Sequence, residues 1–123
     1  MSHWCPFVAS PESLIGGRGE FALAPTHGGI TAATGFKTAG VHCGIKASPS
    51  ALDLAVLTAD APASAAALFT TNLAQAAPVV VSRRHLERSE GIAQAVVVNS
   101  GCANACTGAQ GLEHARRMAD ETA

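Results

Sequence analysis

Residues 93–108 constrain this chain more than any other part of its sequence. Residues 93–98 are almost wholly apolar, which predicts a buried strand. A loop of small and polar residues follows, and a helix pattern comes after it. Because ligand sites in open α/β structures lie beyond the carboxyl ends of strands, we expect a site at this loop first.

Extended segments are predicted before this run. Residues 35–46 alternate polar and apolar side chains, with glycines at intervals, which predicts a strand with bulges. Residues 53–59 are a nearly continuous apolar run, which predicts a buried strand. Turns are expected at 47–50 and 60–62. Residues 63–71 are then expected to form a strand antiparallel to the one before, because turns bound a short segment ending in Leu-Phe-Thr-Thr.

Helices are predicted in the last third of the chain. A short extended piece from residue 76 should pass into a helix that starts at Ser82, its N-cap, and ends at Gly91. Residues 110–122 place apolar and charged side chains on opposite faces, which predicts an amphipathic helix. Strands come first and helices late, an order that favours a layered α+β fold over a strict βαβ array.

The domain organisation follows from the positions of prolines and glycines and from the composition. Residues 1–28 carry several prolines and glycines and no lasting period, so we interpret them as an irregular lead-in with disorder expected at its start. The domain is predicted over 29–123. Charged residues make up 14% of the 123 residues, and aromatic residues 4%. An ordinary soluble domain has about 25% charged residues, so the composition indicates a chain that buries faces against another surface.

Charge and hydropathy exclude two classes of partner. The net charge is −1, and the cluster formed by residues 83–85 and Arg88 is offset by Glu87 and Glu90. We interpret this cluster as a solvated helix face, and expect no nucleic-acid partner. No apolar run is long enough to span a membrane. The first residues do not resemble a secretory signal, and Arg18 is the only Arg before Lys37, so the cytoplasm is the expected compartment.

The four cysteines are Cys5, Cys43, Cys102 and Cys106. Without a signal peptide we expect them to be reduced thiols. A zinc site would need a second cysteine pair beside Cys102 and Cys106, or histidines at suitable spacing, and His114 stands alone. We therefore expect no metal site, and a thiol or metal-binding domain is kept only as an alternative interpretation.

The polar loop supplies the candidate site residues. Asn99, Asn104 and Thr107 are candidates for substrate binding, because their side chains can present oxygens and amides to a small ligand. The alternative is a structural loop whose polar side chains satisfy its own backbone. No catalytic residue is predicted, since a cysteine nucleophile needs a partnered base that the sequence does not place.

Four segments read together resemble one family. They lie at residues 35–46, 53–56, 65–79 and 97–108, and the last reads Val-Val-Asn-Ser-Gly, one Cys, then Ala-Asn-Ala-Cys-Thr-Gly. Their order and spacing resemble the amino-terminal part of the ornithine acetyltransferases, also called bifunctional glutamate N-acetyltransferases. The resemblance covers residues 29–123. It leads us to expect Asn or Gly where this chain has Cys102.

The resemblance implies an enzyme that moves an acetyl group from N-acetylornithine to glutamate, with acetyl-CoA as a second donor in some members and no bound cofactor. Members of the family cleave themselves before a Thr, which becomes the nucleophile of a β chain. A later Thr-Gly pair forms the oxyanion hole. Thr107 and Gly108 belong to an earlier motif and are not that pair.

None of those catalytic residues is therefore carried over to this sequence. The chain is expected to be an α-chain fragment that is inactive alone and works with a missing C-terminal part or β chain, in a heteromeric α/β assembly. A non-catalytic remnant, or an interaction module that needs a complementary chain, is the alternative.

Overall fold

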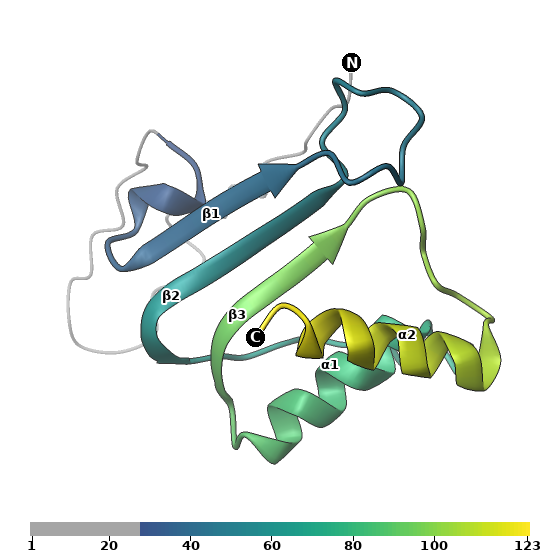
Figure 1. The fold of residues 1–123 in the computed structure, drawn as a ribbon. Helices are drawn as coiled ribbons and strands as arrows, with labels where there is room; N and C mark the ends of the chain where they lie inside the picture. The colour runs from purple at the N-terminus through teal and green to yellow at the C-terminus, as the bar shows by residue number, and fades with distance from the viewer. Residues whose placement is uncertain (1–27) are drawn as a thin grey trace, which may run out of the picture.

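The computed structural model describes residues 28–123. The lead-in predicted over 1–28 lies outside the described residues except for Gly28. Within the described part, three strands and two α-helices follow a short 3-10 helix. In chain order the elements are η2 (Ile30–Ala32), β1 (Phe36–Val41), β2 (Leu54–Ser64), α1 (Ala77–Arg88), β3 (Ile92–Asn99) and α2 (Gly108–Asp120). The predicted α+β class is confirmed (Figure 1).

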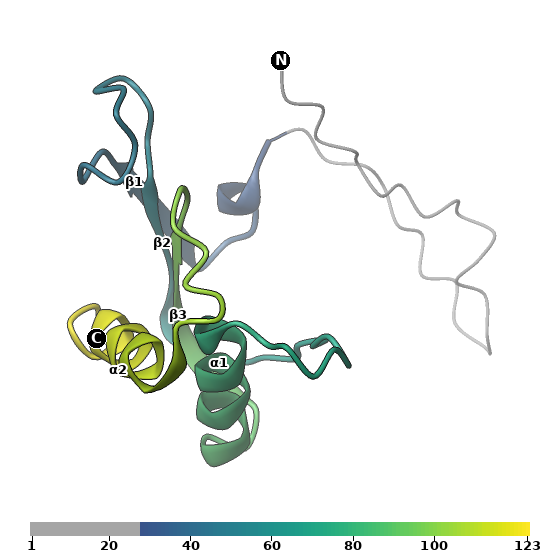
Figure 2. The same cartoon turned by 90° about the vertical axis from the view of Figure 1, so that its right-hand side faces the viewer.

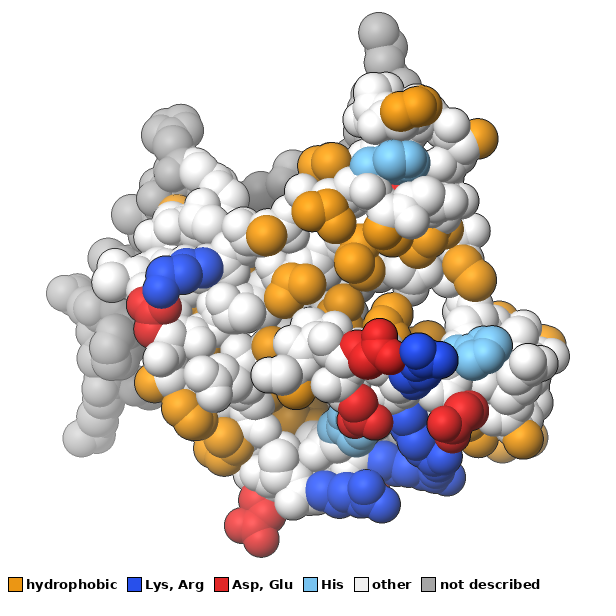
Figure 3. All heavy atoms as spheres, in the orientation of Figure 1, with side chains coloured by type: hydrophobic (Ala, Val, Ile, Leu, Met, Phe, Trp, Pro, Cys, Tyr) orange, Lys and Arg blue, Asp and Glu red, His pale blue; other side chains and the backbone are white. Residues whose placement is uncertain are grey.

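The strands form one antiparallel sheet in the order β1-β2-β3, with β2 in the centre. Val56 of β2 lies opposite Val97, and Leu57 lies opposite Val96. Because side chains alternate between faces along a strand, Val96 and Val98 share one face and Val97 points to the other. Val96 and Val98 remain 51% and 56% exposed, so this chain leaves that apolar face uncovered. Figure 3 shows hydrophobic side chains spread over the surface of the sheet.

The second strand is longer than predicted, and the turn expected at 60–62 is wrong. β2 runs on through Pro62 to Ser64, and the separate strand predicted over 63–71 does not form. The β2–β3 register shifts between Thr58 and Ala63, so Pro62 has no ladder partner on β3. The missing N–H of proline costs little at such an irregularity.

The first helix begins five residues earlier than predicted. Its first residue is Ala77, its N-cap is Ala76 rather than Ser82, and Pro78 lies in the first turn. Proline is accepted there because an N–H of the first turn has no intrahelical partner. The helix ends at Arg88, and the chain turns through Gly91, whose φ is 78°. The second helix is confirmed with its bounds shifted two residues toward the N-terminus.

The buried apolar core lies between the helices and is small. Ala77 and Val81 of α1 pack with Ala115 of α2, and Leu112 closes the cluster. Figures 1 and 2 place the helix pair near the end of the sheet where β3 begins. The sheet and the helix pair therefore share little core within the described residues. Among these residues, no helix is long and apolar enough to cross a membrane.

Candidate functional site

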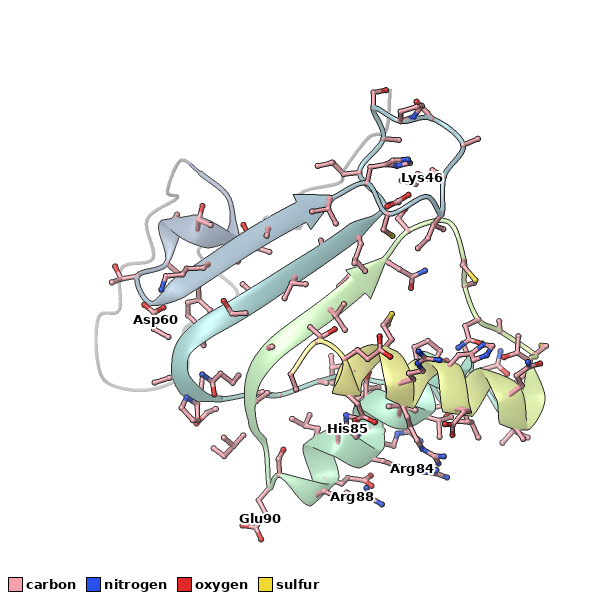
Figure 4. All side chains as sticks on the ribbon, in the orientation of Figure 1. Lys46, Asp60, Arg84, His85, Arg88 and Glu90 are labelled. Atoms are coloured by element: carbon pink, nitrogen blue, oxygen red, sulfur yellow. The ribbon has the colours of Figure 1, made fainter. Side chains whose placement is uncertain are left out.

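Two loops meet at one end of the sheet, where β1 and β3 finish, and one of them carries the predicted site residues. Val41 ends β1, Leu54 begins β2 and Asn99 ends β3, and the register places these three residues side by side. The segment after Val41 and the loop after Asn99 therefore start from the same end of the sheet (Figure 1). Lys46, labelled in Figure 4, lies in the first of these loops.

Asp53 joins these loops and is the most buried polar residue described, at 2% exposed. Its carboxylate accepts hydrogen bonds from the backbone N–H of Cys43 at 2.6 Å and of Lys46 at 2.9 Å. Its own backbone carbonyl accepts the N–H of Ser100 at 2.8 Å. The strand predicted over 35–46 ends at Val41 for this reason, because these bonds hold the next residues in a loop.

The electrostatics of this cluster follow from the same bonds. The backbone N–H groups of Lys46 and Cys43 hold the pKa of Asp53 well below its usual range, so the carboxylate is charged at neutral pH. The Nδ1 atom of His42 lies 3.2 Å from a carboxylate oxygen of Asp53 and 3.0 Å from the carbonyl oxygen of Ala51. The hydrogen bond with Asp53 raises the pKa of the Cys43 thiol. A thiol held protonated in this way is a poor nucleophile.

Asn104 and Thr107 are brought together over the start of α2. The Thr107 hydroxyl donates to Oδ1 of Asn104 at 2.6 Å, and Nδ2 of Asn104 donates to the carbonyl of Gly111 at 2.8 Å. The Asn104 carbonyl accepts the N–H of Ala77 at 3.2 Å, so this residue also contacts the start of α1. Asn104 itself has a φ of 48°, in the left-handed region that asparagine tolerates better than most residues.

Gly111 is required by this arrangement. A Cβ atom there would lie 1.7 Å from the Thr107 hydroxyl oxygen and 2.5 Å from the Asn104 side-chain oxygen. Both distances are far inside van der Waals contact, so the two polar side chains occupy the space that any larger residue would need. The bond from Asn104 to the Gly111 carbonyl is of the kind that a structural loop, the alternative interpretation, would use to satisfy its own backbone.

Asn99 has a different set of contacts. Its Nδ2 atom donates to the carbonyl of Cys102 at 2.8 Å, which closes the turn after β3. Gly101, in that turn, has a φ of 120°, and a Cβ atom there would lie 2.9 Å from a methyl carbon of Ile45. The loop after β3 therefore packs directly on the loop after β1. Among the described residues, no hydrogen bond is made to Oδ1 of Asn99, which leaves that atom available to a ligand.

The cysteines of this region are free and exposed at Cys43, Cys102 and Cys106. Cys106 has a φ of 58°, a left-handed backbone conformation that residues other than glycine rarely adopt. Within residues 28–123, no group of three or more His, Cys, Asp or Glu side chains gathers as a metal site would require.

Sequence reasoning missed Asp53, which it counted only as the first residue of a strand. The available signal was a carboxylate standing directly before a buried apolar run, where a charged side chain needs hydrogen-bond partners. Its partners are backbone N–H groups several residues away, and a local pattern does not reveal such partners.

Comparisons with known proteins agree with the earlier resemblance. A family model described as the ArgJ family matches residues 37–123. The arginine biosynthesis bifunctional protein ArgJ of Chlorobaculum tepidum is 53% identical over 89 residues, which cover 72% of this chain and 22% of that protein. A mitochondrial protein of the same name from Postia placenta is 58% identical over 90 residues, covering 72% of this chain and 19% of that protein.

The fold is also similar to that of a solved relative. The ornithine acetyltransferase of Mycobacterium tuberculosis, solved in complex with ornithine, is 48% identical, with a TM-score of 0.67 over 74% of this chain and 46% of that chain. This chain therefore spans about a fifth of the curated relatives and just under half of the solved chain. The matched segment includes the sheet, both helices and both loops of the candidate site, and the chain belongs to the ArgJ family.

Proposed function

We propose that this chain is the amino-terminal portion of an acetyltransferase that moves an acetyl group from N-acetylornithine to glutamate. The observation that carries the proposal is the likeness to the relative solved with ornithine, at 48% identity and a TM-score of 0.67. Because this chain covers 46% of that protein's chain, the proposal concerns a contribution to an enzyme rather than a complete one.

The proposed contribution of this chain is the pair of loops beside Asp53, at the end of the sheet where β1 and β3 finish. In these loops, Asn99 has a side-chain oxygen that is available to a substrate. A carbonyl oxygen suits the ammonium group of an amino acid. Asn104 and Thr107 act with it by holding the loop in place through the bonds over Gly111. The nucleophilic Thr and the oxyanion Thr-Gly pair that the family resemblance implies are assigned to other parts of the assembly.

The proposed assembly is heteromeric, with an α chain and a β chain produced by self-cleavage. Two features of the described residues support a further polypeptide. Val96 and Val98 leave an apolar sheet face exposed. Leu68 and Leu73, in the irregular segment before α1, are 103% and 100% exposed. Together with the sheet face, these leucines give the described residues a large exposed apolar surface, which is typical of a surface that contacts another polypeptide.

Acetyl-CoA is proposed as a second donor, since the curated relatives are named bifunctional. The cytoplasm is the proposed compartment, supported by three free cysteines among the described residues, as a reducing environment would leave them. Cell fractionation tests the compartment against the mitochondrial location in the names of relatives from fungi such as Postia placenta.

The function is tested by producing this chain together with the part of the Chlorobaculum tepidum protein that follows its matched segment. We expect acetyl transfer from N-acetylornithine to glutamate at roughly 1 per second or more from the co-produced pair. The chain alone should give no detectable turnover, because neither nucleophile nor oxyanion donors are assigned to it. A co-purified, folded but inactive pair would instead indicate a non-catalytic module. Turnover by the chain alone would contradict the proposed division of labour.

A further inference from the structure

The contact between α1 and α2 changes character along its length. It begins as an apolar seam, where Val81 packs with Ala115 and Leu112. One turn beyond Val81, the same face of α1 carries Arg84, and a further turn brings Arg88. One turn beyond Leu112, the facing side of α2 carries Arg116, followed by Asp120.

These side chains line a hollow between the helices with a volume of about 180 Å³. Its lining residues are Val81, Arg84, His85, Arg88, Arg116 and Asp120. Figure 4 shows Arg84, His85 and Arg88 extending from α1 in this region, and Figure 3 shows Lys and Arg side chains interspersed with Asp and Glu side chains over the helix pair. Three arginines from two helices thus line one hollow. Arg84, His85 and Arg88 are exposed, in agreement with their interpretation as a solvated helix face, and Arg116 of α2 is exposed as well.

Most acidic residues of the helix pair do not line this hollow. Arg117 takes Glu121 as its own partner, with Nε and the carboxylate 2.7 Å apart, and this bond raises the pKa of Arg117. Glu87 and Glu90 line a separate hollow on the other side of α1, together with Arg83. Asp120 is the one carboxylate that lines the arginine hollow, and among the described residues Arg84, Arg88 and Arg116 form no ion pair.

Helix electrostatics account for only part of the cluster. Arg88 lies in the last turn of α1, where the helix dipole favours a cation. Arg84 and Arg116 do not lie in the last turn of their helices, so the dipole does not explain their convergence. Arginines that line one hollow without forming an ion pair are typical of sites for doubly charged anions, which accept two parallel hydrogen bonds from each guanidinium group.

We propose that the hollow between α1 and α2 binds a phosphate group, either free or carried by a small molecule. Arg84 and Arg116 hold the phosphate from opposite helices, and Arg88 adds charge at the rim. A phosphate is favoured over a single carboxylate because its two charges and several oxygens match guanidinium groups converging from two directions. Occupation would join the C-terminal halves of the two helices, and so would stabilise the helix pair.

The test uses the full chain and does not require acetyl transfer, so it can fail while the proposed function stands. Helicity and the thermal midpoint are measured by circular dichroism with phosphate, with ADP, and with NaCl at matched ionic strength. A ligand that binds only the folded state raises the midpoint by an amount that grows with the logarithm of its concentration above Kd, even where folding is incomplete without it. Inorganic phosphate is expected to raise the midpoint by several degrees, and a larger effect of ADP would identify a phosphorylated metabolite as the source.

The decisive variant is the double substitution Arg84→Gln with Arg116→Gln, and the matched control is Arg117→Gln, which removes an arginine that does not line the hollow. Calorimetric titration should show phosphate affinity at least tenfold weaker in the double variant and unchanged in the control. Equal responses to phosphate and NaCl would overturn the proposal. Loss of phosphate binding when the remaining polypeptide is co-produced would overturn it too, and would assign the arginines to an acidic segment of that polypeptide.

Discussion

The carboxylate of Asp53 accepts the backbone N–H of Cys43 at 2.6 Å. This bond, with the matching one from Lys46, holds the loop after β1 through its backbone N–H groups. The backbone of Asp53 meanwhile pairs with Val41 on one side and Ser100 on the other. One buried residue therefore sets the relative positions of the two loops at the candidate site.

Replacing Asp53 with Asn should destabilise the two loops at this end of the sheet. A carboxamide offers one oxygen where the carboxylate offers two, and its NH2 group would face a backbone N–H donor. We expect a lower thermal midpoint and faster hydrogen exchange at the amides of Cys43 and Lys46. Asp60→Asn is the matched control, because Asp60 is an exposed acid paired with Lys37. Equal effects of the two substitutions would contradict the anchoring role of Asp53.

Stability should depend on pH through the same carboxylate. The pKa of Asp53 is lowered in the folded chain from an ordinary value of 3.8, so the unfolded chain binds a proton more readily than the folded one. The stabilisation is fully present above that ordinary value and is lost as the pH falls below it. Urea unfolding of the wild-type chain between pH 6 and 3 should show this loss, and Asp53→Asn should show a shallower dependence.

Gly111→Ala should destabilise the chain, although a helical Gly-to-Ala change ordinarily gains about 1 kcal/mol. The added methyl group would meet the Thr107 hydroxyl at 1.7 Å and force the Asn104–Thr107 pair apart. Denaturant unfolding of the double variant Gly111→Ala with Thr107→Ala should recover only part of the loss, because the Cβ atom of residue 107 at 2.6 Å and the Asn104 side-chain oxygen at 2.5 Å remain in the way. A rise in stability for the single variant would show that the two side chains move aside freely.

Asn104→Ala should cost more activity in the co-produced assembly than Cys106→Ala. The asparagine side chain makes bonds to Thr107 and Gly111, and leaving such a partner unpaired costs about 1–3 kcal/mol where that partner is buried. Cys106 is exposed and free. Steady-state kinetics on both variants checks the order. Stoichiometric zinc in the purified protein, or a larger loss for Cys106→Ala, would reverse the assignment.

Val96→Lys should reduce self-association of the isolated chain and weaken its assembly with the remaining polypeptide. Val96 is 51% exposed on the apolar sheet face, so a lysine there is tolerated by the chain alone but opposes burial against a partner. Ala95→Lys, one residue away on the opposite face, is the control. Light scattering and co-purification measure the two effects, and a variant that still assembles normally would place the partner elsewhere.

The elements that the sequence predicted well are those with strong local signals. The apolar run over 93–98 and the amphipathic pattern over 110–122 correspond to β3 and α2, because each pattern matches the period of its element. The irregular stretch of β2 was missed because Pro62 suggests a turn, and only the register shift against β3 shows that it is accommodated. The start of α1 was predicted five residues too late because Ser82 is a favourable N-cap residue, whereas the helix begins at Ala77 with Pro78 in its first turn.

The candidate site also has a part that local sequence signals predict and a part that they do not. Asn99, Asn104 and Thr107 were found because Asn, Thr and Gly in a short loop have known turn preferences. The bonds that join Asn104 to Gly111 and Ala77, and Asp53 to Cys43, connect residues far enough apart that no local period reports them. The arginine hollow likewise combines α1 with α2, and its contents depend on how the helices pack.

The way in which Asp53 holds its loop also bears on how the family can vary. Its partners at positions 43 and 46 are backbone N–H groups, so any residue except proline can stand there without loss of these bonds. The tip at 47–50 lies beyond them, and doubling the length of a flexible loop costs only about 0.6 kcal/mol. Changes in composition and length should therefore be tolerated in this loop, whereas the two bonds that hold it require the carboxylate at position 53.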